Sequence, residues 1–159
     1  MRRLIVFDLD LTLWDHSDIS VTTPPYRRLD EDLMVDASGV PIRLRQGVRS
    51  LLRWLQSRNM TLAIVSWNIE WIAMEALKTL SIYNYFTYMI IEYHPRKDKM
   101  FEKLFRASGF TPSETIYIDD DVEMIKLVTR RYPEIYSIVY AKDVSSMKEL
   151  RRLLEDVLS

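Results

Sequence analysis

The stretch LIVFDLDLTLW, residues 4–14, places two carboxylates directly after an unbroken apolar run. Leu4 to Phe7 are typical of a buried strand, but Asp8 and Asp10 then interrupt the apolar pattern one residue apart. A carboxylate without a partner is costly to bury, so it normally neutralises or finds a cation. In an extended chain, Asp8 and Asp10 point to the same side. We therefore expect a strand whose end presents two acids for a chemical purpose.

Length and composition predict one globular domain with a substantial core, since the 159 residues are 48% hydrophobic. The net charge is -1 and no basic stripe is present, which argues against a nucleic-acid binder. The absence of cysteine excludes disulfides, thiolate metal sites and cysteine nucleophiles. Three glycines are too few for a Gly-rich dinucleotide loop or a Walker phosphate loop. The opening MRRLIVF is too short for a signal peptide or membrane span, so we expect a cytoplasmic protein without membrane contact.

Short apolar runs alternate with helical periods along most of the chain. The expected strands are residues 4–7, 62–66, 88–91, 115–119 and 137–140. Between them, apolar residues recur at helical spacing, as in Val48, Leu51, Leu52 and Leu55. Strand–helix alternation of this kind predicts the α/β class, a three-layer α/β/α sandwich with a central parallel sheet.

Residues 14–46 break this alternation, and two prolines stand together at positions 24 and 25. The segment LMVDASGVPIRL, residues 33–44, predicts a small β-hairpin that turns at Ala37-Ser38-Gly39. We interpret the segment as a minimal cap or flap, inserted after the first strand of a single domain that spans residues 1–159. Insertions beyond the carboxyl ends of parallel strands are where open α/β sheets usually bind ligands.

A second acidic cluster, Asp119 to Asp121, closes the apolar run TIYI. Taken alone, such a cluster is most often a helix N-cap followed by acids in the first turn. If both strands are parallel, however, Asp8 and Asp10 lie at the same edge of the sheet as this cluster, with Thr12 close by. Carboxylates that converge there repel one another unless a cation intervenes. Oxygen ligands without cysteine or histidine favour a hard ion, and Mg²⁺ suits phosphate chemistry.

Two further strand ends supply complementary groups. Ser66 ends the run LAIVS, where it could equally cap the next helix together with Asn68. Beyond residues 88–91, the segment HPRKDK offers Lys97 or Lys99. A solvated surface lysine is the simpler interpretation, but a cation here would balance the oxygens of a bound phosphate.

Asp8-Leu9-Asp10-Leu11-Thr12, Ser66, Lys97 and Asp119-Asp120 occur in the order found in the haloacid dehalogenase (HAD) superfamily of phosphotransferases, which the sequence resembles over nearly its whole length. The runs VFDLDLTLW and YIDDD, the PPY at 24–26 and the small hairpin narrow the resemblance to the magnesium-dependent phosphatase-1 family, a small-cap group. The resemblance implies the HAD-like, Rossmann-like fold and a phosphoric monoester hydrolase.

The resemblance also implies a role for each matching residue. Asp8 matches the nucleophile that forms an aspartyl-phosphate, and Asp10 matches the general acid/base. Ser66 matches the hydroxyl that holds the phosphoryl group. Lys97 matches the cation that bridges phosphate and nucleophile, with Lys99 as the second choice.

A Mg²⁺ cofactor is implied in the same way. The matching ligands are the Asp8 carboxylate, the Asp10 backbone carbonyl and the Asp120 carboxylate, with Asp119 acting directly or through water. The side chains that we expect to contact the substrate are Thr12, Trp14, Trp67 and Asn68.

Trp67 is a departure, because eukaryotic members of the family carry arginine directly after the matching serine. The substrate is therefore open: the resemblance suggests phosphotyrosine in a protein, or a small sugar or fructosamine phosphate. Two alternatives belong to other classes, a phosphorylatable receiver-like signalling domain and a catalytically silent binding module on the same fold. Receivers carry the accepting Asp on their middle strand, whereas we expect the middle strand here to end in Ser66. The filled motif positions disfavour a silent module, and the sequence leaves the oligomeric state open.

Overall fold

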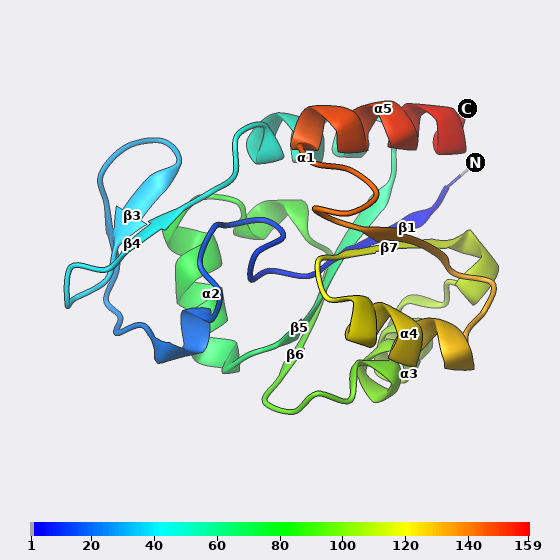
Figure 1. Ribbon diagram of the computed structural model, residues 1–159, viewed down its shortest axis with the longest axis horizontal. Coiled ribbons are helices and arrows are strands. Elements are labelled where there is room, and N and C mark those ends of the chain that lie inside the picture. Colours follow the sequence, from blue (N-terminus) through cyan, green and yellow to red (C-terminus); the bar gives the residue numbers. More distant parts are fainter. Residues whose placement is uncertain (1) are drawn as a thin grey trace.

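The first strand, β1 (Leu4–Phe7), lies in the middle of a five-stranded sheet in the computed structural model, which describes residues 2–159 (Figure 1). The strands follow the order β6-β5-β1-β7-β8, and all neighbours are parallel. Their bounds are β5 (Thr61–Trp67), β6 (Tyr88–Glu92), β7 (Thr115–Asp119) and β8 (Tyr136–Val139). The predicted parallel sheet is confirmed. The expected middle strand was wrong, because β1 and not β5 occupies the centre.

Two hydrophobic cores lie on opposite faces of this sheet because successive strand residues point in opposite directions. Ile5 and Phe7 face one core, which is built with α1 (Val48–Ser57), α2 (Glu70–Thr79) and α5 (Met147–Leu158). Leu4 and Val6 face the other core, built with α3 (Lys97–Ser108) and α4 (Val122–Arg131). The α/β/α sandwich is therefore confirmed (Figure 1). Within residues 2–159, no helix combines the length and apolarity needed to cross a membrane.

Local signals end and begin several of these elements. Gly109 terminates α3 with a positive φ of 75°, a conformation that favours glycine. Ser146 caps α5 by accepting the Glu149 N–H at 3.1 Å. The Glu149 carboxylate binds the Ser145 N–H at 2.8 Å instead of returning to Ser146, so half of a capping box is formed. Short 3₁₀ turns complete the chain: η1 (Ile19–Val21), η2 (Tyr83–Tyr85) and η3 (Pro112–Glu114).

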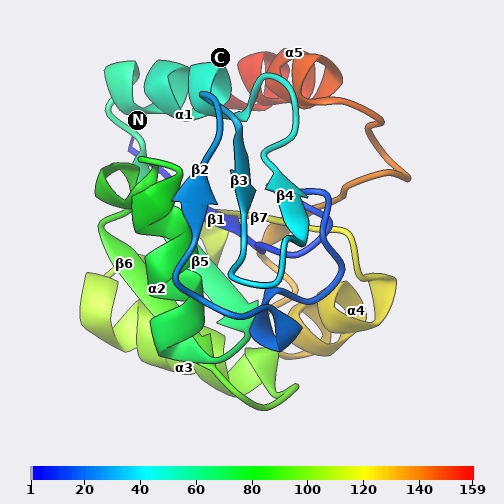
Figure 2. The same cartoon turned by 90° about the vertical axis from the view of Figure 1, so that its left-hand side faces the viewer.

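The segment between β1 and α1 forms a small antiparallel sheet that stands beside the sandwich (Figure 2). Its strands are β2 (Arg27–Arg28), β3 (Leu33–Val35) and β4 (Pro41–Arg43), in that order. The predicted hairpin corresponds to β3 and β4, and β2 adds a strand that the sequence pattern did not reveal. We call residues 14–46 the flap.

Asp36 holds the turn of this hairpin together. Its carboxylate accepts the backbone N–H groups of Ser38 at 2.9 Å and Val40 at 2.8 Å, and that of Thr23 at 2.8 Å. The hydrogen bond from Thr23, followed by those from Val40 and Ser38, lowers the pKa of Asp36. The turn thus depends on an ionised side chain.

We expect Asp36→Ala to lower the melting temperature by several degrees at about pH 7, because three backbone donors lose their acceptor. A carboxyl whose pKa is lowered by folding stabilises the fold above its unfolded pKa, and that contribution vanishes as the pH falls through the folded pKa. The deficit of the variant should therefore shrink below about pH 4. Thermal unfolding followed at several pH values measures it. A deficit independent of pH would contradict the role of the charge.

Candidate active site

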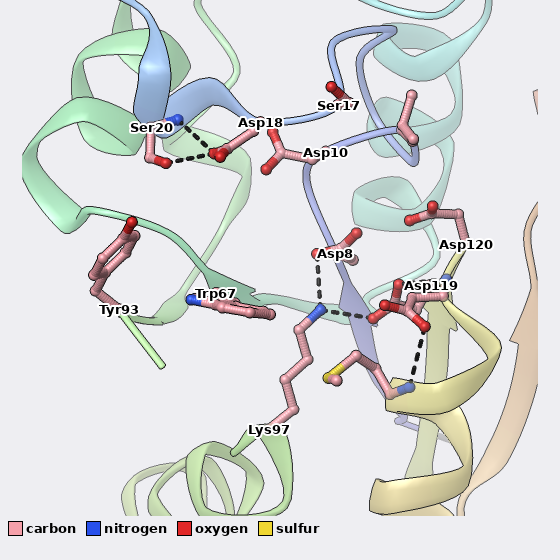
Figure 3. Close-up of a pocket in the computed structure, with 13 residues that line it drawn as sticks. Asp8, Asp10, Ser17, Asp18, Ser20, Trp67, Tyr93, Lys97, Asp119 and Asp120 are labelled. Atoms are coloured by element: carbon pink, nitrogen blue, oxygen red, sulfur yellow. Dashed lines mark hydrogen bonds and ion pairs between the residues drawn. The ribbon is translucent and has the colours of Figure 1, made fainter. Parts of the chain in front are cut away.

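Lys97 joins two carboxylates at the carboxyl edge of the sheet. Asp8 follows β1, Asp119 is the last residue of β7, and Lys97 is the first residue of α3. The Lys97 Nζ lies 2.8 Å from Asp8 Oδ1 and 2.6 Å from Asp119 Oδ2, and all three side chains are buried. Figure 3 shows Lys97 reaching from its helix to both acids. Lys99 is exposed, so Lys97 is the lysine that the fold brings to the acids.

The charges of this group are unbalanced. Burial, together with the nearby Asp119 charge, raises the pKa of Asp8 well above its ordinary value, although Lys97 opposes the shift. Burial alone would lower the pKa of Lys97, but attraction by Asp8 and Asp119 outweighs it and raises that pKa. Asp120 adds a further carboxylate whose pKa is raised by burial and by Asp119. The cluster therefore has more carboxylates than its lysine can neutralise.

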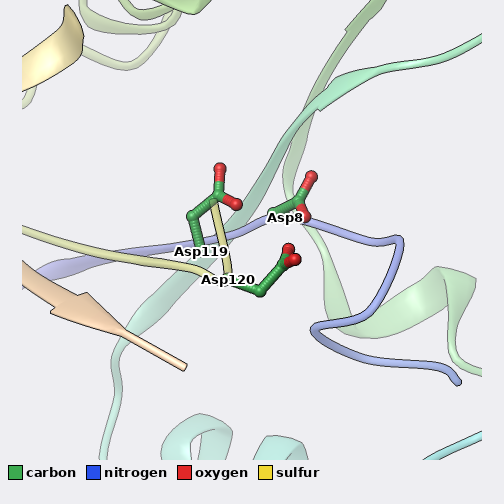
Figure 4. Close-up of side chains that lie close together, drawn as sticks. All are labelled: Asp8, Asp119 and Asp120. Atoms are coloured by element: carbon green, nitrogen blue, oxygen red, sulfur yellow. The ribbon is translucent and has the colours of Figure 1, made fainter. Parts of the chain in front are cut away.

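Asp8, Asp119 and Asp120 fit a divalent cation. Each offers a carboxylate oxygen, and the three oxygens lie within 4.8 Å of one another (Figure 4). Both oxygens of Asp119 are already engaged, one by Lys97 and the Tyr117 hydroxyl and the other by the Asp121 N–H at 2.9 Å. Asp8 is engaged by Lys97 and Thr12, whereas Asp120 is engaged by Thr12 at one oxygen and retains the most freedom to bind a cation. An all-oxygen, anionic donor set of this kind suits a hard ion such as Mg²⁺.

The Thr12 hydroxyl links two carboxylates of this cluster, those of Asp8 and Asp120. Its Oγ1 lies 3.3 Å from Asp8 Oδ2 and 3.2 Å from Asp120 Oδ1, and it accepts the Asp120 N–H at 3.2 Å. The Thr12 side chain is fully buried and does not line the cavity described below. These hydrogen bonds orient the two carboxylates, and the substrate contact expected of Thr12 stays a prediction.

Asp10 is held by three donors, two from the flap and one from the residue that follows β5. Its Oδ1 accepts the Trp14 Nε1–H at 2.8 Å and the Ile19 backbone N–H at 3.0 Å. Its Oδ2 accepts the Asn68 Nδ2–H at 3.1 Å. Burial raises the pKa of Asp10, while the hydrogen bonds from Trp14, Ile19 and Asn68 lower it, and burial prevails. A carboxyl that keeps a proton more readily is suited to act as an acid.

A cavity of about 330 Å³ opens over these acids. Two aromatic side chains line it and remain partly open to solvent, Trp67 at 47% and Tyr93 at 68% exposure. Figure 3 shows both rings on the far side of Lys97 from Asp120. The full lining is Asp8, Asp10, Leu11, Ser17, Asp18, Ser20, Trp67, Tyr93, Lys97, Asp119, Asp120, Asp121 and Met124.

Several of these residues carried no signal in the sequence. Asp18 and Ser20 come from the turn of η1, which follows no helical or strand period, and Tyr93 stands in the loop before α3. Tyr117, which donates its hydroxyl to Asp119, shares a strand face with that residue, so period-two spacing could have identified it.

Trp14 and Asn68 differ from their expected places. Both were expected to contact substrate, yet Trp14 is 0% and Asn68 1% exposed, and neither lines the cavity. The chain turns back after Asp10, with Leu11 at a positive φ of 57°, and this turn buries the Trp14 indole. Ser66 is also buried, and its Oγ accepts the Asn68 Nδ2–H at 2.7 Å. Among the expected substrate contacts, Trp67 does line the cavity.

Comparisons with known proteins agree with this geometry. Residues 1–153 match the Acid Phosphatase family model. Magnesium-dependent phosphatase 1 of Homo sapiens is 32% identical over 122 residues, which cover 76% of this chain and 69% of the human protein. A HAD-superfamily hydrolase from Ehrlichia chaffeensis superposes with a TM-score of 0.73 at 16% identity and full coverage of both chains.

A second solved structure is the N-terminal part of a Bacteroides fragilis protein containing a phosphatase domain, complexed with Mg. It superposes with a TM-score of 0.63 at 14% identity, over 89% of this chain and 37% of that one. At such low identity both structural likenesses show the fold. The family model and the human relative show the family as well, and they confirm the resemblance to magnesium-dependent phosphatases seen in the sequence. The chain therefore belongs to the acid phosphatase family, and its fold is that of HAD-superfamily hydrolases.

Proposed function

We propose that this protein is a Mg²⁺-dependent phosphomonoester hydrolase that works through an aspartyl-phosphate on Asp8. The observation that carries the proposal is the position of the Asp8 carboxylate. It lines the cavity, binds Lys97 at 2.8 Å and lies beside the Asp120 carboxylate. In the same proposal, residues 1–159 act as one phosphatase domain and the flap is its minimal cap.

In the first half-reaction, an Asp8 carboxylate oxygen attacks phosphorus and the bond between phosphorus and the ester oxygen breaks. The electron pair of that bond goes to the leaving oxygen, which takes a proton from Asp10. Lys97 holds Asp8 Oδ1 and offers positive charge to the phosphoryl oxygens. Ser66, whose Oγ accepts from Asn68, keeps its own hydroxyl hydrogen to donate to a phosphoryl oxygen.

In the second half-reaction, Asp10 acts as the base. It takes a proton from water, whose oxygen attacks phosphorus of the aspartyl-phosphate. The bond between phosphorus and the Asp8 oxygen breaks, inorganic phosphate is released and the Asp8 carboxylate is restored. Asp10 now holds a proton taken from water, which replaces the one that left on the alcohol, so the cycle closes.

Mg²⁺ is the cofactor of this proposal. The human relative is named a magnesium-dependent phosphatase, and the donor set described above fits such an ion. We assign its binding to the Asp8 and Asp120 carboxylates and the Asp10 backbone carbonyl, with Asp119 contributing directly or through water. When bound, the ion supplies positive charge that lets an anionic nucleophile approach an anionic phosphate.

The cavity supports a substrate with a flat leaving group. The exposed faces of Trp67 and Tyr93 line it, and aromatic side chains stack favourably on planar groups. The flap leaves the cavity open, so a phosphorylated tyrosine side chain of a protein can enter, as can a small sugar phosphate. We place phosphotyrosine first because its ring matches these aromatic walls.

A receiver-like signalling domain remains the second candidate, and one observation favours it: Asp8 directly follows the middle strand of the sheet, β1, and receivers carry their accepting Asp on the middle strand. The position of Asp10 favours hydrolysis instead. Asp10 lines the same cavity and is firmly held, as an acid/base that serves both half-reactions must be. A receiver would keep its aspartyl-phosphate and release no phosphate under multiple turnover.

We expect purified protein to hydrolyse p-nitrophenyl phosphate with Mg²⁺ and to lose this activity in excess EDTA. Multiple-turnover release of p-nitrophenol and inorganic phosphate measures it. A single stoichiometric burst without turnover would indicate the receiver-like alternative, and turnover that survives EDTA would contradict the metal dependence.

Mg²⁺ should also stabilise the fold, because it relieves repulsion among Asp8, Asp119 and Asp120. At a concentration 100 times its Kd, a ligand specific for the native state adds about 2.7 kcal/mol. Thermal unfolding with Mg²⁺ and with EDTA measures this difference. Asp120→Asn should lose most of the increment, whereas Asp156→Asn, an exposed acid on α5, should keep it. An equal increment in both variants would remove Asp120 from the metal site.

A further inference from the structure

The lone pairs of the Asp10 carboxylate are unequally occupied. Each carboxylate oxygen offers two acceptor positions. Oδ1 fills both, with the Trp14 Nε1–H at 2.8 Å and the Ile19 N–H at 3.0 Å, whereas Oδ2 accepts the Asn68 Nδ2–H at 3.1 Å alone. One position on Oδ2 therefore stays free, and Asp10 lines the cavity in which the ester would lie.

The environment of Asn68 indicates that its hydrogen bond to Asp10 has a role beyond packing. Its side chain is 1% exposed, and its Oδ1 has no hydrogen-bond partner among the described residues. A buried carbonyl without a partner costs free energy, so the two bonds made by the amide nitrogen are obtained at a cost to stability. The amide is instead used through its two N–H groups, one to Asp10 Oδ2 and one to Ser66 Oγ.

Trp14 is anchored equally firmly. Its indole is fully buried, and its backbone forms β-bridges with Asp10 and with Leu44 at the base of the flap. Burial and this backbone pairing therefore fix the position from which the indole N–H donates to Asp10. Rotation of the carboxylate would break hydrogen bonds to the flap and to the end of β5 at once.

We infer that Trp14, Asn68 and the Ile19 N–H are positioning groups that direct the free position of Asp10 Oδ2 toward the ester oxygen. This inference rests on the proposed function. As the P–O bond breaks, its electron pair goes to the ester oxygen, the Oδ2–H bond breaks, and a new O–H bond forms on the leaving alcohol. In the second half-reaction the same Oδ2 position accepts a proton of the attacking water. Asn68 also donates to the Ser66 oxygen, which leaves the hydroxyl hydrogen of Ser66 free to donate to another group.

The test compares two substrates with the same flat ring but different need for a proton. Phenyl phosphate has a poor leaving group and depends on the acid, whereas 2,4-dinitrophenyl phosphate does not. General acid catalysis is worth about 10²–10⁴-fold, so partial misplacement of Asp10 should cost about tenfold or more. We expect Trp14→Phe and Asn68→Leu each to lower kcat/KM for phenyl phosphate by at least that factor relative to 2,4-dinitrophenyl phosphate.

The two variants should differ in a second measurement. Asn68→Leu also removes the donor to Ser66, so it should weaken inhibition by inorganic phosphate, whereas Trp14→Phe should leave that inhibition unchanged. Trp54→Phe on α1 is the matched control, because it truncates a tryptophan outside this site and should preserve the substrate ratio.

Equal losses on both substrates, or no loss, in Trp14→Phe and Asn68→Leu would overturn the positioning role. If Trp14→Phe does not fold, Asn68→Leu still tests the positioning of the Asp10 carboxylate, through its other oxygen, Oδ2. A wild-type protein that hydrolyses neither substrate with Mg²⁺ would instead overturn the proposed function, so the two failures are distinguishable.

Discussion

Asp8→Asn is expected to abolish phosphatase turnover, with a fall in kcat of at least about 10⁴-fold, the scale seen when a covalent nucleophile is removed. The amide nitrogen and carbonyl oxygen of asparagine cannot form the aspartyl-phosphate. The measurement is p-nitrophenyl phosphate hydrolysis with Mg²⁺, combined with acid quenching and mass spectrometry for a phosphoryl group on the peptide that contains residue 8. The wild type should show this adduct and Asp8→Asn should not.

Loss of folding does not account for such a result. Burial and Asp119 raise the pKa of Asp8, so its ionised form is destabilising near neutral pH when the metal is removed. Asp8→Asn removes that charge and leaves Lys97 paired with Asp119. In EDTA the variant should therefore melt no lower than the wild type. Asp156→Asn, the exposed control, should keep full activity. Substantial turnover by Asp8→Asn would remove Asp8 as the nucleophile.

Lys97→Met is expected to affect both stability and activity. Removal of one partner from a buried ion pair leaves an uncompensated charge and typically costs about 3–5 kcal/mol. Here the loss leaves Asp8 and Asp119, each buried, without their shared cation. Loss of a positive donor to a transferring phosphoryl group should also lower kcat by about 10²–10³-fold. Chemical denaturation in EDTA and steady-state kinetics with Mg²⁺ measure the two effects.

Lys99→Met is the matched control, since Lys99 is exposed on the same helix. It should change neither property. Mg²⁺ should stabilise Lys97→Met more than the wild type, because the ion becomes the remaining source of positive charge beside Asp8 and Asp119. A Lys97→Met protein with wild-type stability in EDTA would show that the acids do not depend on the lysine.

The strands were predictable from the sequence because a parallel sheet covered on both faces requires continuous apolar runs. The runs at 4–7 and 115–119 coincide with β1 and β7. The ends of β5, β6 and β8 differ from the expected ones by one residue. The reason is that apolar residues indicate which positions are buried, whereas the ends of a strand depend on its backbone pairing. Trp67 is 47% exposed yet pairs with Glu92, so β5 extends beyond its apolar part.

The meeting of Asp8 with Asp119 and Asp120 was also predictable, because parallel strands bring their carboxyl ends to one edge. The choice between Lys97 and Lys99 was not, because it depends on where α3 begins and thus on which lysine faces the sheet. The burial of Trp14 was not predictable for a similar reason. Its nearness in sequence to Asp10 indicated the site, but the turn at Leu11 buries the indole and leaves only its N–H in contact with the acid.

The flap has a consequence for how this fold can diversify. Ile19, in the flap, donates to Asp10, as does Trp14 at its first position. The flap is therefore not a separable cover over a finished catalytic core. An exchange of this insertion for a larger cap, by evolution or by design, has to preserve the first turn of the segment or rebuild its donors. The hairpin of β3 and β4 makes no hydrogen bond to Asp10 itself, but its end at Leu44 pairs with Trp14, so a new cap also has to keep that pairing.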